Sequence, residues 1–169
     1  GIGASLGKLF GLPRAMKGGI GSASLRAHGV TVAAMVAVNA IGDVIDPATG
    51  LPLAGARTED GLRLQHTARS IVQGLPVSVP ATGSATTIGV VATDAVLTKP
   101  QANRLATVAH DGLARSINPV HTMSDGDTLF ALATGGAGHT PPMTVLGTLA
   151  AEVVARAVLN AVRAATGLQ

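Results

Sequence analysis

Cysteine, tryptophan and tyrosine are absent from this chain of 169 residues, and phenylalanine occurs only twice. Without cysteine the chain can form neither a disulfide nor a thiolate metal site, and the same absence favours a cytoplasmic protein. Aromatic residues make up 1% of the chain although hydrophobic residues make up 47%, so the core must consist of Ala, Val, Leu and Ile. Because such small side chains bury little surface each, we expect oligomer formation to add stability.

Charged residues are also scarce, at 12% of the chain, and the formal net charge is only +3. The Lys and Arg residues are scattered, and stacking aromatics are missing, so the composition does not indicate a nucleic-acid partner. The apolar run over residues 30–38 is too short to span a bilayer, which argues against a membrane partner. The length suits one domain with a core of its own.

The first half of the chain is rich in glycine and then in polar residues. Residues 1–29 predict tight turns around a site, and residues 30–45 predict either one long buried strand or two pieces that meet at Asn39. A short helix is expected around residues 61–73. The Pro, Gly and Ser residues over 76–84 then indicate a mobile linker, the kind of exposed chain where cleavage concentrates.

The second half predicts strand, helix, strand and helix in turn. We expect strands over 86–93 and 127–134, and Thr98 with Gln101 forms a capping box for a helix that should end before Pro119. The last helix should run from Thr140 to about Gly167. Its polar residues recur every four positions in a single stripe, so we expect it to be buried nearly all round, in part against another subunit. The stripe consists of Glu152, Arg156 and Asn160.

A hydroxyl residue stands where the linker meets the first of these strands. Cleavage just before Thr86 would turn this residue into an N-terminal nucleophile whose own amine serves as the base. Composition alone does not support that interpretation, because threonine is common in strands. The element order by itself indicates α and β elements in packed layers.

Other polar residues have ordinary explanations when each is considered alone. Lys8 is typical of a surface lysine, and a phosphate-binding loop is excluded because Ile2 and Leu9 stand where that motif needs Gly and Ser or Thr. Asn39 interrupts an apolar run, so it is either a hydrogen-bonded core residue or a donor to an oxyanion.

Two acidic residues and two histidines remain as candidates. Asp125 and Asp127 flank a glycine in what is either an ordinary turn or a weak candidate for a divalent metal, since a third adjacent acidic ligand is missing. His110 and His121 invite a Ser/His/Asp interpretation, but neither lies in a nucleophile elbow. We therefore assign both histidines a structural role.

Several separate segments, in the right order, resemble one family. It is the self-cleaving aminopeptidase and amidase family, peptidase family S58, which includes the D-aminopeptidase DmpA, the β-peptidyl aminopeptidases and the nylon-oligomer hydrolases. The resemblance implies a four-layer αββα sandwich, an α/β fold of the N-terminal-nucleophile-hydrolase type. A threonine nucleophile and residues 6–11 favour the nylon-oligomer hydrolase branch. The matching segments are residues 17–24, 38–43, 84–95, 109–115 and 121–128.

The resemblance also assigns roles to individual residues. Thr86 lies eight residues before Asp94, as the family nucleophile does, so it is preferred over Thr87, and the expected scissile bond joins Ala85 to Thr86. The nylon-oligomer hydrolases usually have Asn before this bond, but other members have a small residue. In the family, a lysine at the position of Lys8 belongs to the active site. The resemblance makes Asn39 an oxyanion donor, and it places the carboxylates of Asp125 and Asp127 around the nucleophile.

The expected function is that of an amide-bond hydrolase activated by its own cleavage. Its substrates would be small peptides, β-peptides or aminohexanoate-type oligomers, without a cofactor or a metal, and its assembly would be a homotetramer. We expect residues 1–169 to form one catalytic domain, the latter part of a larger precursor, cleaved into residues 1–85 and 86–169. Two alternatives stay open: an acyl transferase like the ornithine acetyltransferases, and an uncleaved, inactive oligomeric scaffold.

Overall fold

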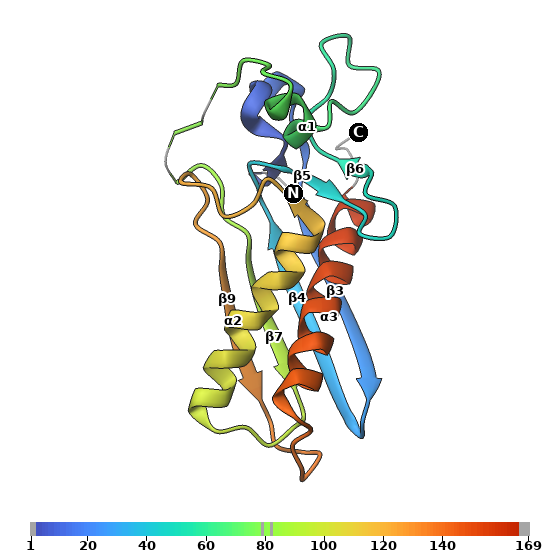
Figure 1. Cartoon of the computed structure of the whole chain (residues 1–169), viewed down its shortest axis with the longest axis vertical. Helices are drawn as coiled ribbons and strands as arrows, with labels where there is room; N and C mark the ends of the chain where they lie inside the picture. Colours follow the sequence, from blue (N-terminus) through green and yellow to red (C-terminus); the bar gives the residue numbers. More distant parts are fainter. Residues whose placement is uncertain (1–2, 79, 82, 166–169) are drawn as a thin grey trace.

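The computed structural model describes residues 3–78, 80–81 and 83–165. A sheet of four strands is the centre of the fold, with two long helices on one of its faces and two small sheets near the end that lies uppermost in Figure 1. The elements are β1 (Ser5–Leu6), η1 (Lys8–Phe10), η2 (Leu12–Arg14), β2 (Met16–Lys17), β3 (Gly19–Ala27), β4 (Val30–Val38), β5 (Asp43–Ile45), β6 (Pro52–Ala54), α1 (Thr67–Val72), β7 (Ile88–Thr93), α2 (Lys99–Ser116), β8 (Ile117–Asn118), β9 (Thr128–Ala133) and α3 (Met143–Ala164).

The main sheet has the strand order β3-β4-β7-β9. Strands β3 and β4 form an antiparallel hairpin, and β4 pairs with β7 in antiparallel fashion. Strand β7 then pairs with β9 in parallel, with Ile88 opposite Thr128 and Thr93 opposite Ala133. Because parallel neighbours require a crossover, the chain passes through α2 between these two strands. The end of β4, the start of β7 and the start of β9 therefore lie at the same end of the sheet, where these strands begin or finish.

The core lies between the sheet and the two long helices. Alternate residues of β4, from Val30 to Val38, are buried on the helix side, as the period of a strand requires. Small residues allow close packing on this side. An ideal Cβ at Gly21 of β3 would lie 2.2 Å from the carbonyl oxygen of Ala157 in α3, and one at Gly112 of α2 would lie 2.4 Å from that of Ala151. Backbone approaches backbone here, which explains how a core almost without aromatic residues stays well packed.

The other face of the sheet carries apolar side chains that the described residues leave exposed. Phe130 of β9 is 58% exposed, and the other large side chains on this face are similarly open: Ile20, Met35, Ile88 and Leu132. The sequence implies a four-layer αββα sandwich, and this chain supplies one helix layer and one sheet layer of that arrangement. The open face is the side of the sheet on which a second sheet packs in such a sandwich.

Most of the elements expected from the sequence are present. The capping box of Thr98 and Gln101 opens α2, and that helix ends at Ser116, before Pro119. The long apolar run is divided at Asn39 into β4 and β5, and the short helix α1 lies inside the expected range. The described part of the segment from residue 76 to 84 contains neither helix nor strand, and Ser78 donates a backbone hydrogen bond to the Leu9 carbonyl.

Three expectations differ from the structure. The glycine-rich start contains a nine-residue strand, β3, in addition to turns, because its alternate glycines face α3. Helix α3 begins at Met143 instead of Thr140, and the expected end at Gly167 lies outside the described residues. The apolar faces of α3 are buried against β3, β4 and α2, so their burial does not require a second subunit.

Helix α3 is also long and apolar enough to cross a membrane, judged by length and composition alone. In the structure 61% of its most apolar window is buried inside the protein. Its polar stripe faces outward, where Glu152 pairs with Arg115 of α2 at 3.0 Å and with Arg156 at 2.9 Å. These contacts are typical of the core helix of a folded domain, whose apolar residues pack against a sheet.

The contact between β3 and α3 leads to a testable prediction. Gly21→Ala places a methyl group against the α3 backbone, so we expect the free energy of unfolding to fall by about 1–3 kcal/mol, as for overpacked cores. Urea unfolding of the full-length protein measures this change. Ser22→Ala, at the exposed neighbouring position, is the control and should change stability by less than about 0.5 kcal/mol. Equal stability of the two variants would contradict the close packing.

Candidate active site

The residues singled out from the sequence lie together at the upper edge of the main sheet in Figure 1. Asn39 follows β4, Thr86 precedes β7, and Asp125 and Asp127 precede β9. Lys8 lies in the short 3-10 helix η1 and is only 3% exposed. The polar contacts between these segments define one continuous site, which is built from parts of the sequence far from one another.

The Ala85–Thr86 peptide is the centre of this site. Ala85 is fully buried, and its carbonyl oxygen accepts hydrogen bonds from the Gly126 N–H at 2.9 Å and from the Thr86 hydroxyl at 2.7 Å. The Thr86 N–H donates to the Asn39 carbonyl at 2.7 Å. The linker was expected to present this bond on an exposed, mobile segment. The structure instead holds the bond in fixed geometry within the fold, with the Thr86 hydroxyl beside the adjoining carbonyl.

Lys8 is held against the residue that precedes this peptide. Its ammonium Nζ donates to the Ser84 carbonyl at 2.7 Å and to Asn39 Oδ1 at 2.6 Å. Burial lowers the pKa of Lys8 below its usual value, and the Asp125 carboxylate partly offsets that effect. Lys8 is therefore a buried, hydrogen-bonded cation in the site, and the interpretation as an ordinary surface lysine does not fit the structure.

Asn39 has a side-chain orientation that the contacts around it determine. Its Oδ1 accepts from both Lys8 Nζ and the Ser5 N–H, the latter at 3.1 Å. The amide nitrogen Nδ2 must therefore point the other way, and it makes no hydrogen bond to the residues that the structure describes. An amide N–H₂ that is oriented but unused is available to donate to an oxyanion.

The two aspartates hold different parts of the site. Asp125 accepts from the Thr122 N–H and hydroxyl and, at 3.3 Å, from the Ile41 N–H, so it fixes the loop that carries Gly126. Asp127 Oδ1 accepts from the Thr87 N–H at 2.8 Å. Asp127 thus contacts the amide of the residue after Thr86 and makes no described hydrogen bond to Thr86 itself.

Sequence reasoning missed two participants. Gly126 contributes a backbone N–H, and an ideal Cβ there would lie 2.7 Å from Thr86 Oγ1, so a side chain at this position would displace the hydroxyl. His121, assigned a structural role from the sequence, lies with Nδ1 3.0 Å from Asp127 Oδ2. Backbone donors carry no residue-type signal, although the glycine between two aspartates could have indicated a close approach to the nucleophile.

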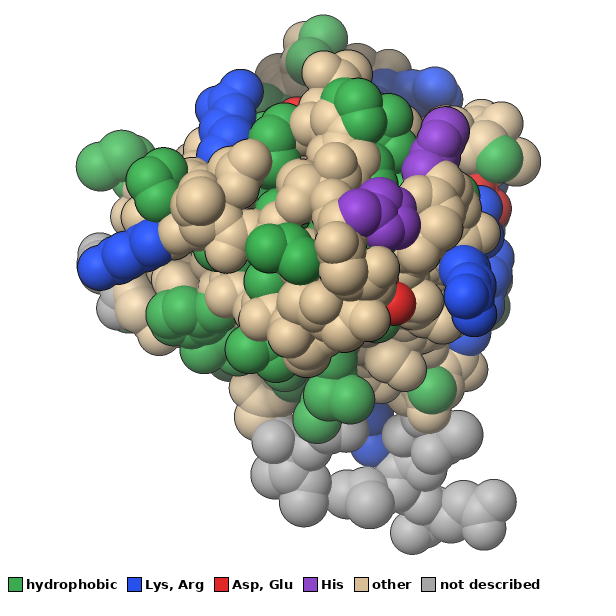
Figure 2. All heavy atoms as spheres, turned by 90° about the horizontal axis from the view of Figure 1, so that it is seen from below, with side chains coloured by type: hydrophobic (Ala, Val, Ile, Leu, Met, Phe, Trp, Pro, Cys, Tyr) green, Lys and Arg blue, Asp and Glu red, His purple; other side chains and the backbone are tan. Residues whose placement is uncertain are grey.

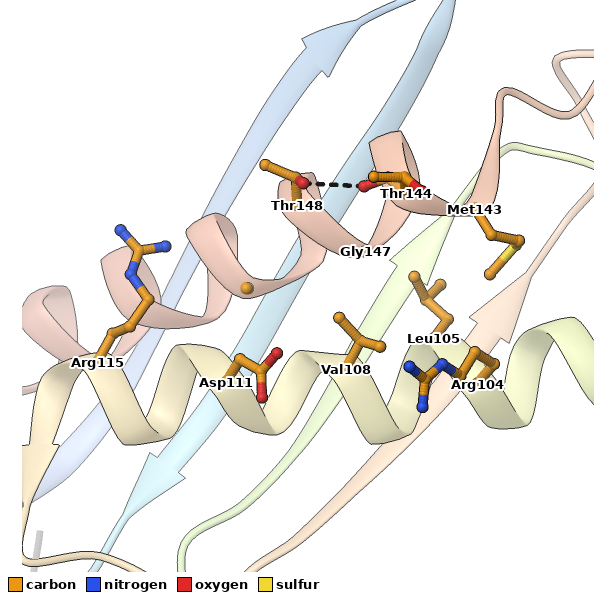
Figure 3. Close-up of a pocket in the computed structure, with 10 residues that line it drawn as sticks. Arg104, Leu105, Val108, Asp111, Arg115, Met143, Thr144, Gly147 and Thr148 are labelled. Carbon is orange, nitrogen blue, oxygen red and sulfur yellow. Dashed lines mark hydrogen bonds between the residues drawn. The ribbon is translucent and has the colours of Figure 1, made fainter.

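A separate groove lies away from this site. A groove of about 520 Å³ runs between α2 and α3, and its lining includes Arg104, Asp111 and Arg115 of α2 and Thr144 and Thr148 of α3 (Figure 3). It contains none of the residues described above, so we do not assign it the chemistry. Within the described residues there is also no group of three or more His, Asp or Glu side chains that could hold a metal ion.

Comparison with known structures identifies the class of fold. The chain superposes on a β-aminopeptidase of a Burkholderia species with a TM-score of 0.59, at 28% identity over 91% of this chain and 44% of that one. It superposes equally well, at 24% identity, over 88% of this chain and 41% of the L-aminopeptidase D-Ala-esterase/amidase of Ochrobactrum anthropi, which is described as a variant of the Ntn-hydrolase fold. The protein therefore has an α/β fold of the N-terminal-nucleophile-hydrolase class.

Sequence comparison identifies the family within that class. Residues 3–169 match Peptidase family S58, and the chain belongs to this family. It is 42% identical over 178 residues to an uncharacterized aminopeptidase of Mycobacterium leprae, and 31% identical over 176 residues to a 6-aminohexanoate-oligomer endohydrolase of a Kocuria species. These matches cover 97% and 96% of this chain but only 48% and 49% of the relatives. The chain thus spans about half the length of the relatives it matches.

The environment of Lys8 predicts how its ammonium titrates. NMR detection of the Lys8 side chain should give a pKa below the ordinary value of 10.5, because burial penalises the charged form. Asp125→Asn should lower that pKa further, since the Asp125 carboxylate is the charge that raises it. Asp111→Asn, which removes a carboxylate of α2 that is not among the charges acting on Lys8, is the control. A Lys8 pKa that rises in Asp125→Asn would contradict the described site.

Proposed function

We propose that the protein is an amide-bond hydrolase that activates itself by cleaving the Ala85–Thr86 bond. The observation that carries this proposal is the pair of donors on the Ala85 carbonyl, the Gly126 N–H and the Thr86 hydroxyl. The hydroxyl oxygen lies 2.7 Å from the carbonyl oxygen of a buried peptide that already accepts a backbone N–H, and intramolecular attack then requires it to turn toward the adjoining carbonyl carbon. Thr87 is the less suitable nucleophile, because its buried hydroxyl has no described hydrogen-bond partner.

The cleavage proceeds by acyl transfer within one residue. Thr86 Oγ forms a bond to the carbonyl carbon of Ala85, and the C–N bond of the peptide breaks. The proton lost by the hydroxyl passes to the nitrogen of Thr86, which becomes a free amine, and Ala85 is left as an ester. The Gly126 N–H stabilises the charge that develops on the carbonyl oxygen. Water then hydrolyses the ester, which releases the Ala85 carboxylate and regenerates the hydroxyl of Thr86.

The same group then attacks substrates. The free α-amine of Thr86 has a reference pKa of about 7.7, so it is a usable base near neutral pH. The nearby Lys8 ammonium favours the neutral form of this amine, because two cations repel each other. Asn39 Nδ2, which is oriented but unused, donates to the oxyanion of the substrate amide. An acyl-enzyme forms on Thr86 Oγ, the amine product leaves, and water completes the hydrolysis.

The substrates that we propose are small linear amides: peptides with a free amino terminus, β-peptides or aminohexanoate-type oligomers. The names of the relatives support this class, since one is an aminopeptidase and another acts on 6-aminohexanoate oligomers. We further propose that the protein is cytoplasmic and that it forms a homotetramer. Sedimentation of the cleaved protein would measure the number of subunits. An acyl-transferase function is not favoured by any observation in the structure.

Variants of the nucleophile test the proposal. Denaturing mass spectrometry of the full-length protein should find two fragments, the second of which begins Thr86-Thr87-Ile88. Thr86→Ala should leave one intact and inactive chain, because the attacking hydroxyl is gone. Thr86→Ser should retain cleavage, since the hydroxyl survives. Thr87→Ala is the matched control and should still be cleaved at the same bond.

If the unsubstituted protein is found as one intact chain, the proposal is wrong and the inactive scaffold is the better interpretation. A second fragment that begins at any other residue would mean that Thr86 is not the nucleophile. In either case the pair of donors on the Ala85 carbonyl would be only a feature of the sheet edge.

The close approach of Gly126 to Thr86 gives a separate prediction. Gly126→Ala keeps the backbone N–H but brings a methyl group against the Thr86 hydroxyl, and it should slow cleavage by about 10²-fold, because a small displacement of the attacking atom is enough to cost that much. Gly136→Ala, where an ideal Cβ meets nothing closer than 3.6 Å, is the control and should be cleaved at the parent rate. The time course of fragment formation measures both. Unchanged cleavage in Gly126→Ala would show that the position of the Thr86 hydroxyl beside residue 126 does not matter for the reaction.

A further inference from the structure

Asp127 is a buried carboxylate with few partners. Its side chain is 2% exposed, and its Oδ1 accepts from the Thr87 N–H at 2.8 Å. Among the described residues its other oxygen, Oδ2, has no hydrogen-bond partner, and His121 Nδ1 approaches it at 3.0 Å. A buried carboxylate oxygen is stabilised by a positive or polar neighbour, and the His121 ring is the group in that position.

His121 is placed for this contact by an unusual backbone. Its φ is +54°, in the left-handed region that residues other than Gly, Asn and Asp seldom adopt. The next residue, Thr122, donates both its N–H and its hydroxyl to Asp125. The loop that presents His121 is thus fixed from its other side by the second aspartate of the site, and the imidazole side chain remains 40% exposed.

The charged groups around this pair are few. Helix α2 contributes His110, whose ring centre lies 5.0 Å from that of His121, and Asp111 one residue further on. Burial lowers the pKa of His110, and His121 lowers it further, whereas Asp127 and Asp111 act in the opposite direction. The ring of His121 is the one in contact with Asp127, at 3.0 Å. The other charges of the site, Lys8 and Asp125, lie on η1 and on the same loop.

We propose that His121 is a positioning residue of the self-cleavage and hydrolysis reactions. It fixes the Asp127 carboxylate, which in turn fixes the Thr87 N–H and so the backbone on which the nucleophile Thr86 sits. This proposal rests on the proposed function, but the contact chain itself is defined by geometry: His121 Nδ1 to Asp127 Oδ2, and Asp127 Oδ1 to Thr87 N. If the backbone at residues 86 and 87 is mobile, the Thr86 hydroxyl loses the alignment with the Ala85 carbonyl that intramolecular attack requires.

Two substitutions at residue 121 distinguish the contact of its side chain with Asp127 from the left-handed conformation of its backbone. Glycine and asparagine both tolerate the left-handed conformation at residue 121. His121→Gly removes the donor, whereas His121→Asn places an amide N–H₂ close to the position of Nδ1 and keeps it. His28→Gly is the matched control. His28 also has a positive φ, of +51°, and it lies at the β3–β4 turn, the whole length of β4 from Asn39. Histidine side chains are visible on that end of the molecule (Figure 2), where His139 Nε2 lies 3.1 Å from the His28 carbonyl oxygen.

The first measurement is the rate of self-cleavage of the full-length protein. His121→Gly should cleave roughly tenfold or more slowly, because the 3.0 Å contact that holds the buried carboxylate is lost. His121→Asn should recover most of that loss, and His28→Gly should cleave at the parent rate. His121→Gly cleaving as fast as the parent protein would overturn the proposal, and so would His121→Asn cleaving as slowly as His121→Gly.

The second measurement does not depend on cleavage. In the Thr86→Ala background, the Thr87 amide hydrogen should exchange roughly tenfold faster when His121→Gly is added, and His121→Asn should restore most of the protection. If the parent protein never cleaves, the proposed function fails, while the exchange rates still decide whether His121 holds Asp127 against Thr87. Unchanged exchange in His121→Gly would overturn the proposal even if cleavage were slower.

Discussion

The hydrogen bond from the Gly126 N–H to the Ala85 carbonyl is the interaction on which the site depends. It continues the parallel pairing of β7 and β9 beyond their ends, because the Thr128 N–H donates to the Thr87 carbonyl two residues further along in the same way. The register that aligns Ile88 with Thr128 therefore also aligns Ala85 with Asp125. The pairing of two parallel strands thus places the Gly126 N–H against the Ala85 carbonyl, and no side chain is needed for this contact.

The electrostatics of the site follow from that placement. Lys8, Asp125 and Asp127 are ionisable groups with little or partial exposure, and each is tied to backbone groups of segments far from it in the sequence. Such a set is stable only when nearly all donors and acceptors are used. The Asn39 oxygen is used by Lys8, while its nitrogen makes no hydrogen bond to the described residues. In the part of the chain that the structure describes, the buried atoms without a hydrogen-bond partner near the site are Thr87 Oγ1 and Asp127 Oδ2, and such atoms are rare in folded proteins.

Local secondary structure could be predicted from the sequence, whereas contacts between distant segments could not. The capping box, the break at Asn39 and the strands after residue 86 follow from short patterns, and they are present in the structure. Strand β3 was missed, because its glycines signal turns locally and reveal their role only when α3 packs against them. The site residues came from the family resemblance, whereas Gly126 and His121 act through a backbone N–H and a loop conformation. Neither of those features depends on a recognisable spacing.

The amino-acid composition also did not indicate which part of the fold carries the exposed apolar surface. Expectation put it on the last helix, as a surface for another subunit, yet the apolar residues of α3 are buried within this chain. The open surface is instead the sheet face that carries Ile20, Met35 and Phe130. An apolar patch on a flat sheet is a liability unless another layer covers it. In a four-layer sandwich the two sheets pack against each other about 10 Å apart, through side chains that alternate along each strand. The alternation in β3, β4, β7 and β9 meets that requirement. The same strands that align the Ala85–Thr86 peptide at one end of the sheet therefore present the inner surface of the sandwich on their open face.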